Sequence, residues 1–392
     1  MSTASQRFGW YLALLQLLFT LCWTVYAIYL PKLAAGAGLP HGAIILLLMA
    51  DQAVFTICDF LTGIAADKVT RVLGRLGRWV AGITVLSCAA FLALPFAAAA
   101  GAPAFLALTL LWTVTSSALR APPLMLLGKY AAKPAIPLLS SLAMLGYGLA
   151  GAVSPYLGVV LRDIDPRWPF ALSSIALVLT TLGMITAERR LAAAREPEPP
   201  VRAFGTFSAS AAAFALAMIV LALGYQLHFA LQSAPLYLRF AKAPDLQWLM
   251  PVFWIGFNIA MFPASIITKR VGGYAVTAAA GLIGALAIVL THLASGLAPL
   301  IAAQFVCGAA WGTILMSAFT VAFAIGANGG EGRMSGLLFS ALALATLARM
   351  ASVATGFGAE PALQWVPTLF WAMAGAALIY LVPGGDNRAI AR

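Results

Sequence analysis

The chain has 392 residues, of which 62% are hydrophobic and only 9% carry a charge. Soluble domains have roughly a quarter of their residues charged, so this composition excludes a soluble enzyme, a nucleic-acid-binding module and a disordered chain. The net charge of +11 does not indicate nucleic-acid binding, because the basic residues lie in short connections between apolar runs. We therefore expect an integral membrane protein that has the lipid bilayer as its surroundings.

Continuous apolar runs of about 20 residues predict helices that cross roughly 30 Å of hydrocarbon, whereas transmembrane β-strands would alternate polar and apolar residues. The first run follows Arg7 and is too long for a signal-peptide core, so we expect it to be an uncleaved span. Pro122, Pro123, Pro134 and Pro137 leave room for the fourth and fifth spans to merge or shift. The twelve predicted spans are 8–30, 41–66, 79–97, 103–127, 134–161, 168–187, 207–233, 245–268, 274–293, 298–325, 335–358 and 362–382.

The longest polar connection, 188–206, is charged and rich in proline, which predicts a solvated cytoplasmic linker. It divides the chain into an N-terminal six-helix bundle over 1–187 and a C-terminal six-helix bundle over 207–392. Two halves of six spans suggest two repeats that enclose a site near the membrane midplane.

The loops on the two sides of the membrane differ in their content of Lys and Arg, and the richer side is usually cytoplasmic. The poorer side holds Lys32, Arg162, Arg167, Arg239 and Lys242, while the richer side includes both termini. We therefore expect a multi-pass protein of the inner or plasma membrane with both termini in the cytoplasm.

Cys22, Cys58, Cys88 and Cys307 all lie inside apolar runs and show no metal-ligand spacing. We accordingly expect no disulfide framework, no metal site and no cofactor. The sequence contains neither a clustered nucleophile and base, which an enzyme would need, nor a phosphate-binding loop for ATP.

The segment that follows the second predicted span reads Gly-Ile-Ala-Ala-Asp-Lys-Val-Thr-Arg over 63–71, and it resembles a loop motif of the major facilitator superfamily. The resemblance implies twelve helices in two six-helix bundles around a central cavity, and a loop that latches the cytoplasmic side. The alternative is an ordinary positively charged loop with an incidental Asp. The matching residues are Gly63, Asp67, Lys68 and Arg71.

Two further segments resemble motifs of the same family. Arg120 in span four matches a family arginine, although Pro123 and Leu124 stand where the family has Gln and Gly. Span five resembles the family's antiporter motif, which hints at export; equally, its small residues and proline predict a bent, closely packed helix. The residues of the span-five motif are Gly151, Ser154, Pro155 and Gly158.

Four ionisable residues lie inside apolar spans, where an arginine costs about 2.5–3.5 kcal/mol or more on insertion scales. Asp59 and Arg120 are expected at similar depth, and we predict an ion pair between them; alternatively, Arg120 extends to the cytoplasmic headgroups. Asp51 and Arg349 are predicted near the midplane as a pair between the halves that changes during transport. A buried carboxylate is a candidate proton carrier, or else a static structural group.

In the family that the chain resembles, spans one, four, seven and ten line the cavity, and each carries polar or aromatic residues here. Polar side chains that face lipid would lack hydrogen-bond partners, so we expect them to point inward. For each residue the alternative is packing between helices. The predicted cavity residues are Gln16, Trp23, Tyr26, Trp112, Ser116, Tyr225, His228, Gln232, Gln304 and Trp311, with Trp254 and Asn258 from span eight.

These features favour a monomeric secondary transporter that moves a small organic anion or zwitterion by alternating access and is coupled to protons. A facilitator that uses no ion gradient and a metal importer are alternatives within the same class. An alternative of another class is a non-transporting membrane sensor or assembly factor. The substrate and the direction of transport stay open at this point.

Overall fold

The structure is a computed structural model that describes residues 3–73, 76–193, 209–327, 329–357 and 360–381. Within these ranges there is no β-strand, and twelve helical segments are long and apolar enough to span a membrane. This confirms the predicted all-α fold with twelve spans. In the N-terminal half the helices are α1 (Thr3–Gly36), α2 (Ala43–Leu73), α3 (Leu76–Ala99), α4 (Ala102–Ser116), α5 (Ala121–Tyr130), α6 (Ile136–Val160) and α7 (Arg167–Ala193).

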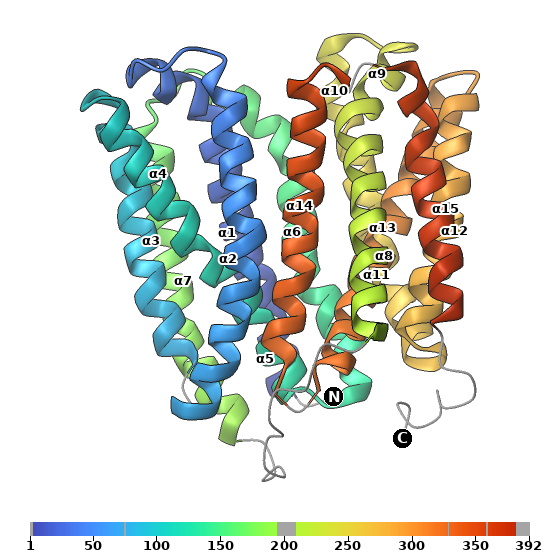
Figure 1. Cartoon of the computed structure of the whole chain (residues 1–392), viewed down its shortest axis with the longest axis horizontal. Coiled ribbons are helices and arrows are strands. Elements are labelled where there is room, and N and C mark those ends of the chain that lie inside the picture. The colour runs from blue at the N-terminus through green and yellow to red at the C-terminus, as the bar shows by residue number, and fades with distance from the viewer. Residues whose placement is uncertain (1–2, 74–75, 194–208, 328, 358–359, 382–392) are drawn as a thin grey trace.

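The C-terminal half also contains six of the candidate spans among the described residues, and it lies beside the first half (Figure 1). Two of its spans, α13 and α14, run unbroken over 29 and 24 residues. Its helices are α8 (Ala209–Tyr225), α9 (Ser233–Leu238), α10 (Leu246–Leu249), α11 (Pro251–Val271), α12 (Gly273–Leu293), α13 (Leu297–Ile325), α14 (Glu331–Ala354) and α15 (Val366–Tyr380).

The outer surface of the bundle is apolar, as a surface surrounded by lipid requires. Leu172 is 72% exposed and Leu286 is 62% exposed, and many other large apolar side chains point outward in the same way. Polar side chains such as Gln304 and Ser317 are instead fully buried between helices. Lipid offers no hydrogen bonds, so this distribution is the reverse of that in a soluble protein.

The two halves meet along two seams, α2 against α14 and α6 against α11. We call the end of the bundle at which α1 begins and α2 ends the basic face. This face is at the bottom of Figure 1. The helix ends at this face carry Lys68, Lys129, Lys133, Lys269 and Arg270.

Two predicted loops prove to be partly helical. Helix α2 continues to Leu73, so the segment 63–71 is helix rather than loop. Helix α7 continues to Ala193, and Glu188, expected in the linker, is buried. Its carboxylate accepts hydrogen bonds from the backbone amides of Leu76 and Gly77, at 2.7 and 2.6 Å, which caps the start of α3. Residues 194–208 of the predicted linker lie outside the described residues.

The fourth span is broken inside the membrane. Helix α4 ends at Ser116, a 3-10 turn covers Ser117–Leu119, and α5 begins at Ala121. Pro122 and Pro123 have no backbone N–H, so the carbonyls four residues earlier lose their helical partners. Arg120 lies at this break, with a backbone ψ of −77°.

The seventh span contains a second irregularity, a π-helix over Gln226–Gln232 between α8 and α9. A π-helical segment inserts extra residues into the helical turn and rotates the side chains that follow. This rotation decides which polar side chains of the span face the centre of the protein.

Candidate functional site

A cavity of about 250 Å³ lies between the two halves and receives side chains from both of them. Its walls combine aromatic rings with amide and hydroxyl groups and with two arginines. We call it the central cavity. Its lining residues are Gln16, Phe19, Thr20, Trp23, Gln52, Phe55, Arg120, Tyr147, Tyr225, Gln226, Phe339, Leu342, Thr346, Arg349 and Met350.

Arg120 forms an ion pair with Asp59 and also lines the central cavity. Its Nη1 lies 3.0 Å from Asp59 Oδ2, and Asp59 is completely buried. Neither oxygen of Asp59 has a hydrogen-bond partner with good geometry among the described residues. The contact is therefore a close electrostatic pair between a guanidinium and a buried carboxylate.

Aromatic rings from both halves hold the Arg120 guanidinium in place. The Phe55 ring of α2 lies 4.6 Å from it and the Phe339 ring of α14 lies 5.1 Å from it, and both rings line the same cavity. Arg120 is 15% exposed. Its side chain thus lies in the protein interior and does not extend to the headgroups.

Asp51 does not pair with Arg349 in this structure. Its Oδ2 accepts a hydrogen bond from Tyr26 Oη at 2.9 Å, and its Oδ1 accepts one from Thr113 Oγ1 at 2.7 Å. All three residues belong to the N-terminal half. The sequence could not show that these two hydroxyls, on neighbouring helices, hydrogen-bond Asp51 in place of Arg349.

Arg349 lies on α14 and lines the central cavity. Among the described residues it forms no ion pair, and its Nε has no hydrogen-bond partner. The cavity therefore contains one arginine that is compensated by a carboxylate and one that is not.

Several of the predicted cavity residues lie behind the lining in the N-terminal half. Gln16 and Trp23 line the cavity. Trp112 stacks on Trp23 with ring centroids 5.6 Å apart, and Tyr26 packs against Trp112 at 4.7 Å. Ser116 is buried and donates a hydrogen bond to the carbonyl of Thr113. These second-layer rings support the wall instead of facing the cavity.

The C-terminal half shows the same layering. Tyr225 lines the cavity, and Trp311 stacks on it at 4.5 Å with an interplanar angle of 5°. Trp254 packs edge-on against Tyr147 at 5.4 Å. Asn258 donates a hydrogen bond to the carbonyl of Trp254. Trp254 and Asn258 thus belong to the seam between α6 and α11.

His228, Gln232 and Gln304 form hydrogen bonds inside the C-terminal half and are not among the residues that line the cavity. His228 Nε2 lies 3.2 Å from Gln304 Oε1, and Gln304 also bonds Ser233. Gln232 donates a hydrogen bond to the carbonyl of Leu363. These three residues therefore pack between helices, which was the alternative to a position on the cavity wall.

Gln52, Gln226 and Thr346 line the cavity and are polar residues in apolar spans, but the sequence analysis did not predict them. Gln52 follows Asp51, and Gln226 donates a hydrogen bond to Thr346 Oγ1 at 2.9 Å. The polarity of these side chains within apolar spans could have identified them from the sequence as candidate cavity residues. The π-helix over Gln226–Gln232 shifts the side-chain phase of span seven, so a regular helix predicts the wrong face there.

Two of the predicted latch residues, Gly63 and Asp67, lie where α2 meets α14 at the basic face. Asp67 accepts hydrogen bonds from the backbone amides of Gly332 and Arg333, at 2.7 and 2.8 Å, and so caps α14 from the other half. A Cβ at Gly63 would collide with the carbonyl oxygen of Gly332, so glycine permits this approach. Lys68 is exposed, and the side chain of Arg71 lies outside the described residues.

The span-five motif serves packing. A Cβ at Gly151 would collide with the Trp254 ring, and Ser154 Oγ lies 2.9 Å from Thr24 Oγ1 of α1. Pro155 lies inside α6, and nothing approaches the Cβ position of Gly158 within 4 Å. Among the described residues there is no group of three or more His, Cys, Asp or Glu that could hold a metal ion.

The sequence profile of the Major Facilitator Superfamily matches residues 12–347, which is most of the chain. The chain belongs to the Major Facilitator Superfamily. It is accordingly a multi-pass membrane transporter and not an enzyme. No curated protein shows significant similarity to it in sequence.

Solved structures of other superfamily members share the fold at low sequence identity. The human organic anion transporter MFSD10 is 17% identical, with a TM-score of 0.74 over 97% of this chain and 100% of that one. A bacterial homologue of the iron transporter ferroportin, in an outward-facing state, is 12% identical, with a TM-score of 0.75 over 95% and 99%. The E. coli fucose:proton symporter FucP is 16% identical, with a TM-score of 0.66 over 97% and 99%.

Proposed function

We propose that this transporter is a proton-coupled secondary transporter for a small organic anion or zwitterion. The observation that carries the proposal is the pair of arginines in the central cavity, of which only Arg120 has a carboxylate partner among the described residues. A cationic substrate would meet an uncompensated guanidinium there, whereas an anionic group would neutralise it.

The shape and chemistry of the cavity support a substrate with both apolar and polar parts. Trp23, Tyr147 and Tyr225 offer flat aromatic surface, while Gln16 and Gln52 offer amide donors and acceptors. A volume of about 250 Å³ suits a small metabolite or drug fragment. MFSD10, one of the similar structures, is described as an organic anion transporter, which agrees with this proposal.

Proton coupling is proposed to act through Asp59. An anionic substrate that attracts Arg120 draws the guanidinium away from Asp59 and leaves a buried carboxylate without a counter-charge. Such a carboxylate favours the protonated form. The anion and the proton would then occupy the protein in the same state, as in a symporter.

Alternating access is proposed to require release of the basic face. In the structure α2 and α14 close that face, with Asp67 bound to the start of α14. We propose that the basic face is cytoplasmic, in keeping with the excess of Lys and Arg there. The closed latch would then correspond to the state that exchanges substrate with the opposite side.

Transport by purified protein in liposomes tests this proposal. Organic anions should accumulate when a pH gradient is imposed, and Arg349→Gln should raise KM by roughly tenfold or more, because an arginine–anion hydrogen bond is worth about 1.5–3 kcal/mol. Arg162→Gln removes the same charge from an exposed site and serves as the control.

Four results would contradict the proposal. Unchanged KM in Arg349→Gln would remove the arginine from the substrate site. Equilibration without any effect of the pH gradient would identify a facilitator instead, while transport of a metal ion alone would identify a metal importer. No transport of any tested solute, with intact folding, would favour a sensor.

A further inference from the structure

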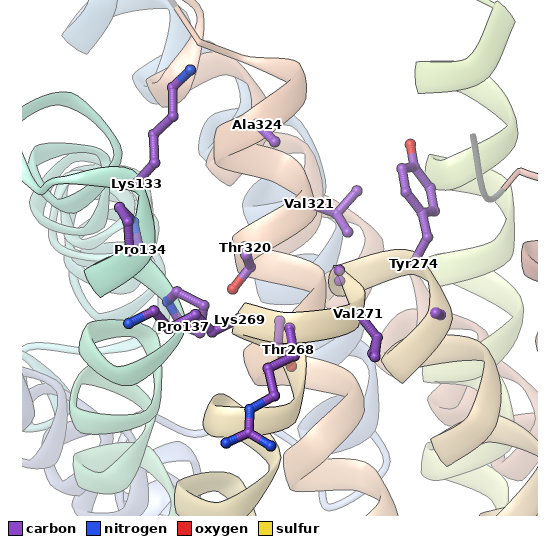
Figure 2. Close-up of a pocket in the computed structure, with 14 residues that line it drawn as sticks. Lys133, Pro134, Pro137, Thr268, Lys269, Val271, Tyr274, Thr320, Val321 and Ala324 are labelled. Carbon is purple, nitrogen blue, oxygen red and sulfur yellow. The ribbon is translucent and has the colours of Figure 1, made fainter. Parts of the chain in front are cut away.

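A second cavity opens at the basic face, away from the central cavity, and has a volume of about 110 Å³ (Figure 2). One water molecule needs roughly 10–15 Å³ by the same measure, so a polyatomic ion fits. The cavity lies where the start of α6, from the N-terminal half, meets the ends of α11 and α13 and the start of α12. Both halves of the protein therefore contribute to its walls.

Three cationic side chains surround this second cavity: Lys133 from the N-terminal half and Lys269 and Arg270 from the C-terminal half. None of them forms an ion pair with another described residue. In Figure 2 Lys133 extends from the start of α6, while Lys269 extends from the end of α11 towards Pro137 of the other half. All three cationic side chains are exposed, and a bound anion would lower their mutual repulsion.

The start of α12 adds backbone donors. Its N-cap residue is Gly272, with a φ of +90°, and no side chain caps this helix end. The first amides of the helix, beginning at Gly273, therefore lack partners within the helix, and the helix dipole favours negative charge at this point. Gly272, Gly273, Tyr274 and Ala275 all line the cavity.

An independent observation is the hydroxyl of Thr268. This residue is only 3% exposed and lines the cavity, yet its Oγ1 has no hydrogen-bond partner within the part of the chain that the structure describes. Thr70 and Thr277, by contrast, donate to the carbonyl four residues earlier in their helices. A buried hydroxyl without a partner costs free energy, so its position beside the cationic groups indicates a ligand that supplies the missing acceptor.

We propose that the second cavity binds a phosphate group, either free in solution or as the headgroup of an anionic lipid. Lys133, Lys269 and Arg270 would neutralise its charge, the first amides of α12 and Thr268 Oγ1 would donate to its oxygens, and the bound group would join the two halves. Exposed apolar residues next to the cavity, Ile266, Ile267 and Val271, offer a surface for an acyl chain. Binding would thus stabilise the conformation in which the basic face is closed.

Thermal unfolding of the purified full-length protein tests the proposal. One arm adds inorganic phosphate against sodium chloride of equal ionic strength; the other adds short-chain phosphatidylglycerol against phosphatidylcholine. At least one phosphate-bearing probe should raise the unfolding temperature in a saturable manner. The arm that responds identifies the source of the phosphate group, and no response in either arm overturns the proposal.

Variants separate a specific site from general screening of charge. The double variant Lys269→Gln/Arg270→Gln should weaken binding of the responding probe by at least about tenfold. The control variant Arg190→Gln removes a basic residue at the end of α7 and should leave binding unchanged. Thr268→Val should weaken binding roughly three- to tenfold while leaving the ligand-free protein as stable or more so, since it removes an unsatisfied hydroxyl. Equal responses in all variants would overturn the proposal.

Discussion

At the scale of single residues, the membrane interior makes every buried charge depend on its immediate partners. Asp59 has a guanidinium 3.0 Å away but no aligned hydrogen bond among the described residues, while Asp51 has two hydroxyl donors and no cation. The first arrangement can change when another anion approaches Arg120. Asp51 is instead held by the neutral hydroxyls of Tyr26 and Thr113 in its own half, and it has no arginine partner among the described residues that an anion could attract.

We therefore predict that Asp59→Asn abolishes accumulation of substrate driven by a pH gradient but preserves counterflow exchange. The amide keeps the shape of the side chain and cannot carry a proton. Uptake and counterflow in liposomes measure the two activities separately. Gradient-driven accumulation at the wild-type level in this variant would exclude Asp59 as the proton carrier.

Asp51→Asn is the matched control, because it makes the same chemical change at the neighbouring buried carboxyl. It should keep gradient-driven accumulation and lower the free energy of unfolding by about 1–3 kcal/mol, since one charged acceptor of the Tyr26 and Thr113 hydroxyls is lost. Loss of coupling in Asp51→Asn alone would transfer the proton-carrying role to Asp51.

At the scale of helices, the basic face is closed by one helix end binding the start of another. Asp67 near the end of α2 supplies the cap that α14 lacks, because the N-cap residue of α14 is Gly330. Gly63 and Gly336 allow the two backbones to touch. The proposed latch is thus a helix cap shared between the two halves, and separation of the halves would break it.

We predict that Asp67→Ala shifts the protein toward the state with an open basic face. Loss of a helix cap costs about 0.5–2 kcal/mol, which corresponds to a change of roughly two- to thirtyfold in the equilibrium. The fully buried Ser335, replaced by Cys in a background without the native cysteines, should react faster with a charged thiol reagent. The control Lys68→Ala should leave the rate of thiol labelling unchanged, because Lys68 is exposed. Equal labelling rates in all variants would show that Asp67 does not control opening of the basic face.

Two interrupted helices position the groups that line the central cavity. The break before Pro122 places Arg120 between Asp59 and the cavity, and the π-helix in span seven places Gln226 against Thr346. Irregular backbone is tolerated inside a membrane only where protein or a polar cavity satisfies it. The interruptions therefore coincide with the proposed substrate site.

At the scale of the whole molecule, both proposed sites lie between the halves, so each ligand can act on how the halves are arranged. The central cavity takes residues from α1, α2 and α6 on one side and from α8 and α14 on the other. An anion there would pull on Arg120 and Arg349 together. A ligand shifts an equilibrium only by its difference in affinity for the two states.

Coupling through Asp59 has a definite sign. If anion binding draws Arg120 from Asp59, a proton is taken up on binding, and by linkage the affinity for the anion must rise as the pH falls, by up to about tenfold per pH unit. Calorimetry in buffers of different ionisation enthalpy should detect this uptake in the wild type and not in Asp59→Asn. Proton release on binding would instead indicate competition, as in an antiporter.

The sequence by itself determined the class of fold. Continuous apolar runs and the scarcity of charge indicate membrane-spanning helices, and the segment that contains Gly63 and Asp67 identified the family. Depth within the membrane was also readable, because each residue advances a helix by a fixed rise; this is why Asp59 and Arg120 were correctly placed at one level.

Only the tertiary structure decided which side chains meet. Composition cannot show that Tyr26 and Thr113 reach Asp51 before Arg349 does, since the three donors lie on different helices. Helical phase cannot be extended through a π-helix, so His228 proved internal while Gln226 lines the cavity. Contacts between helices depend on rotation and distance, and these follow from the packing of all the helices together.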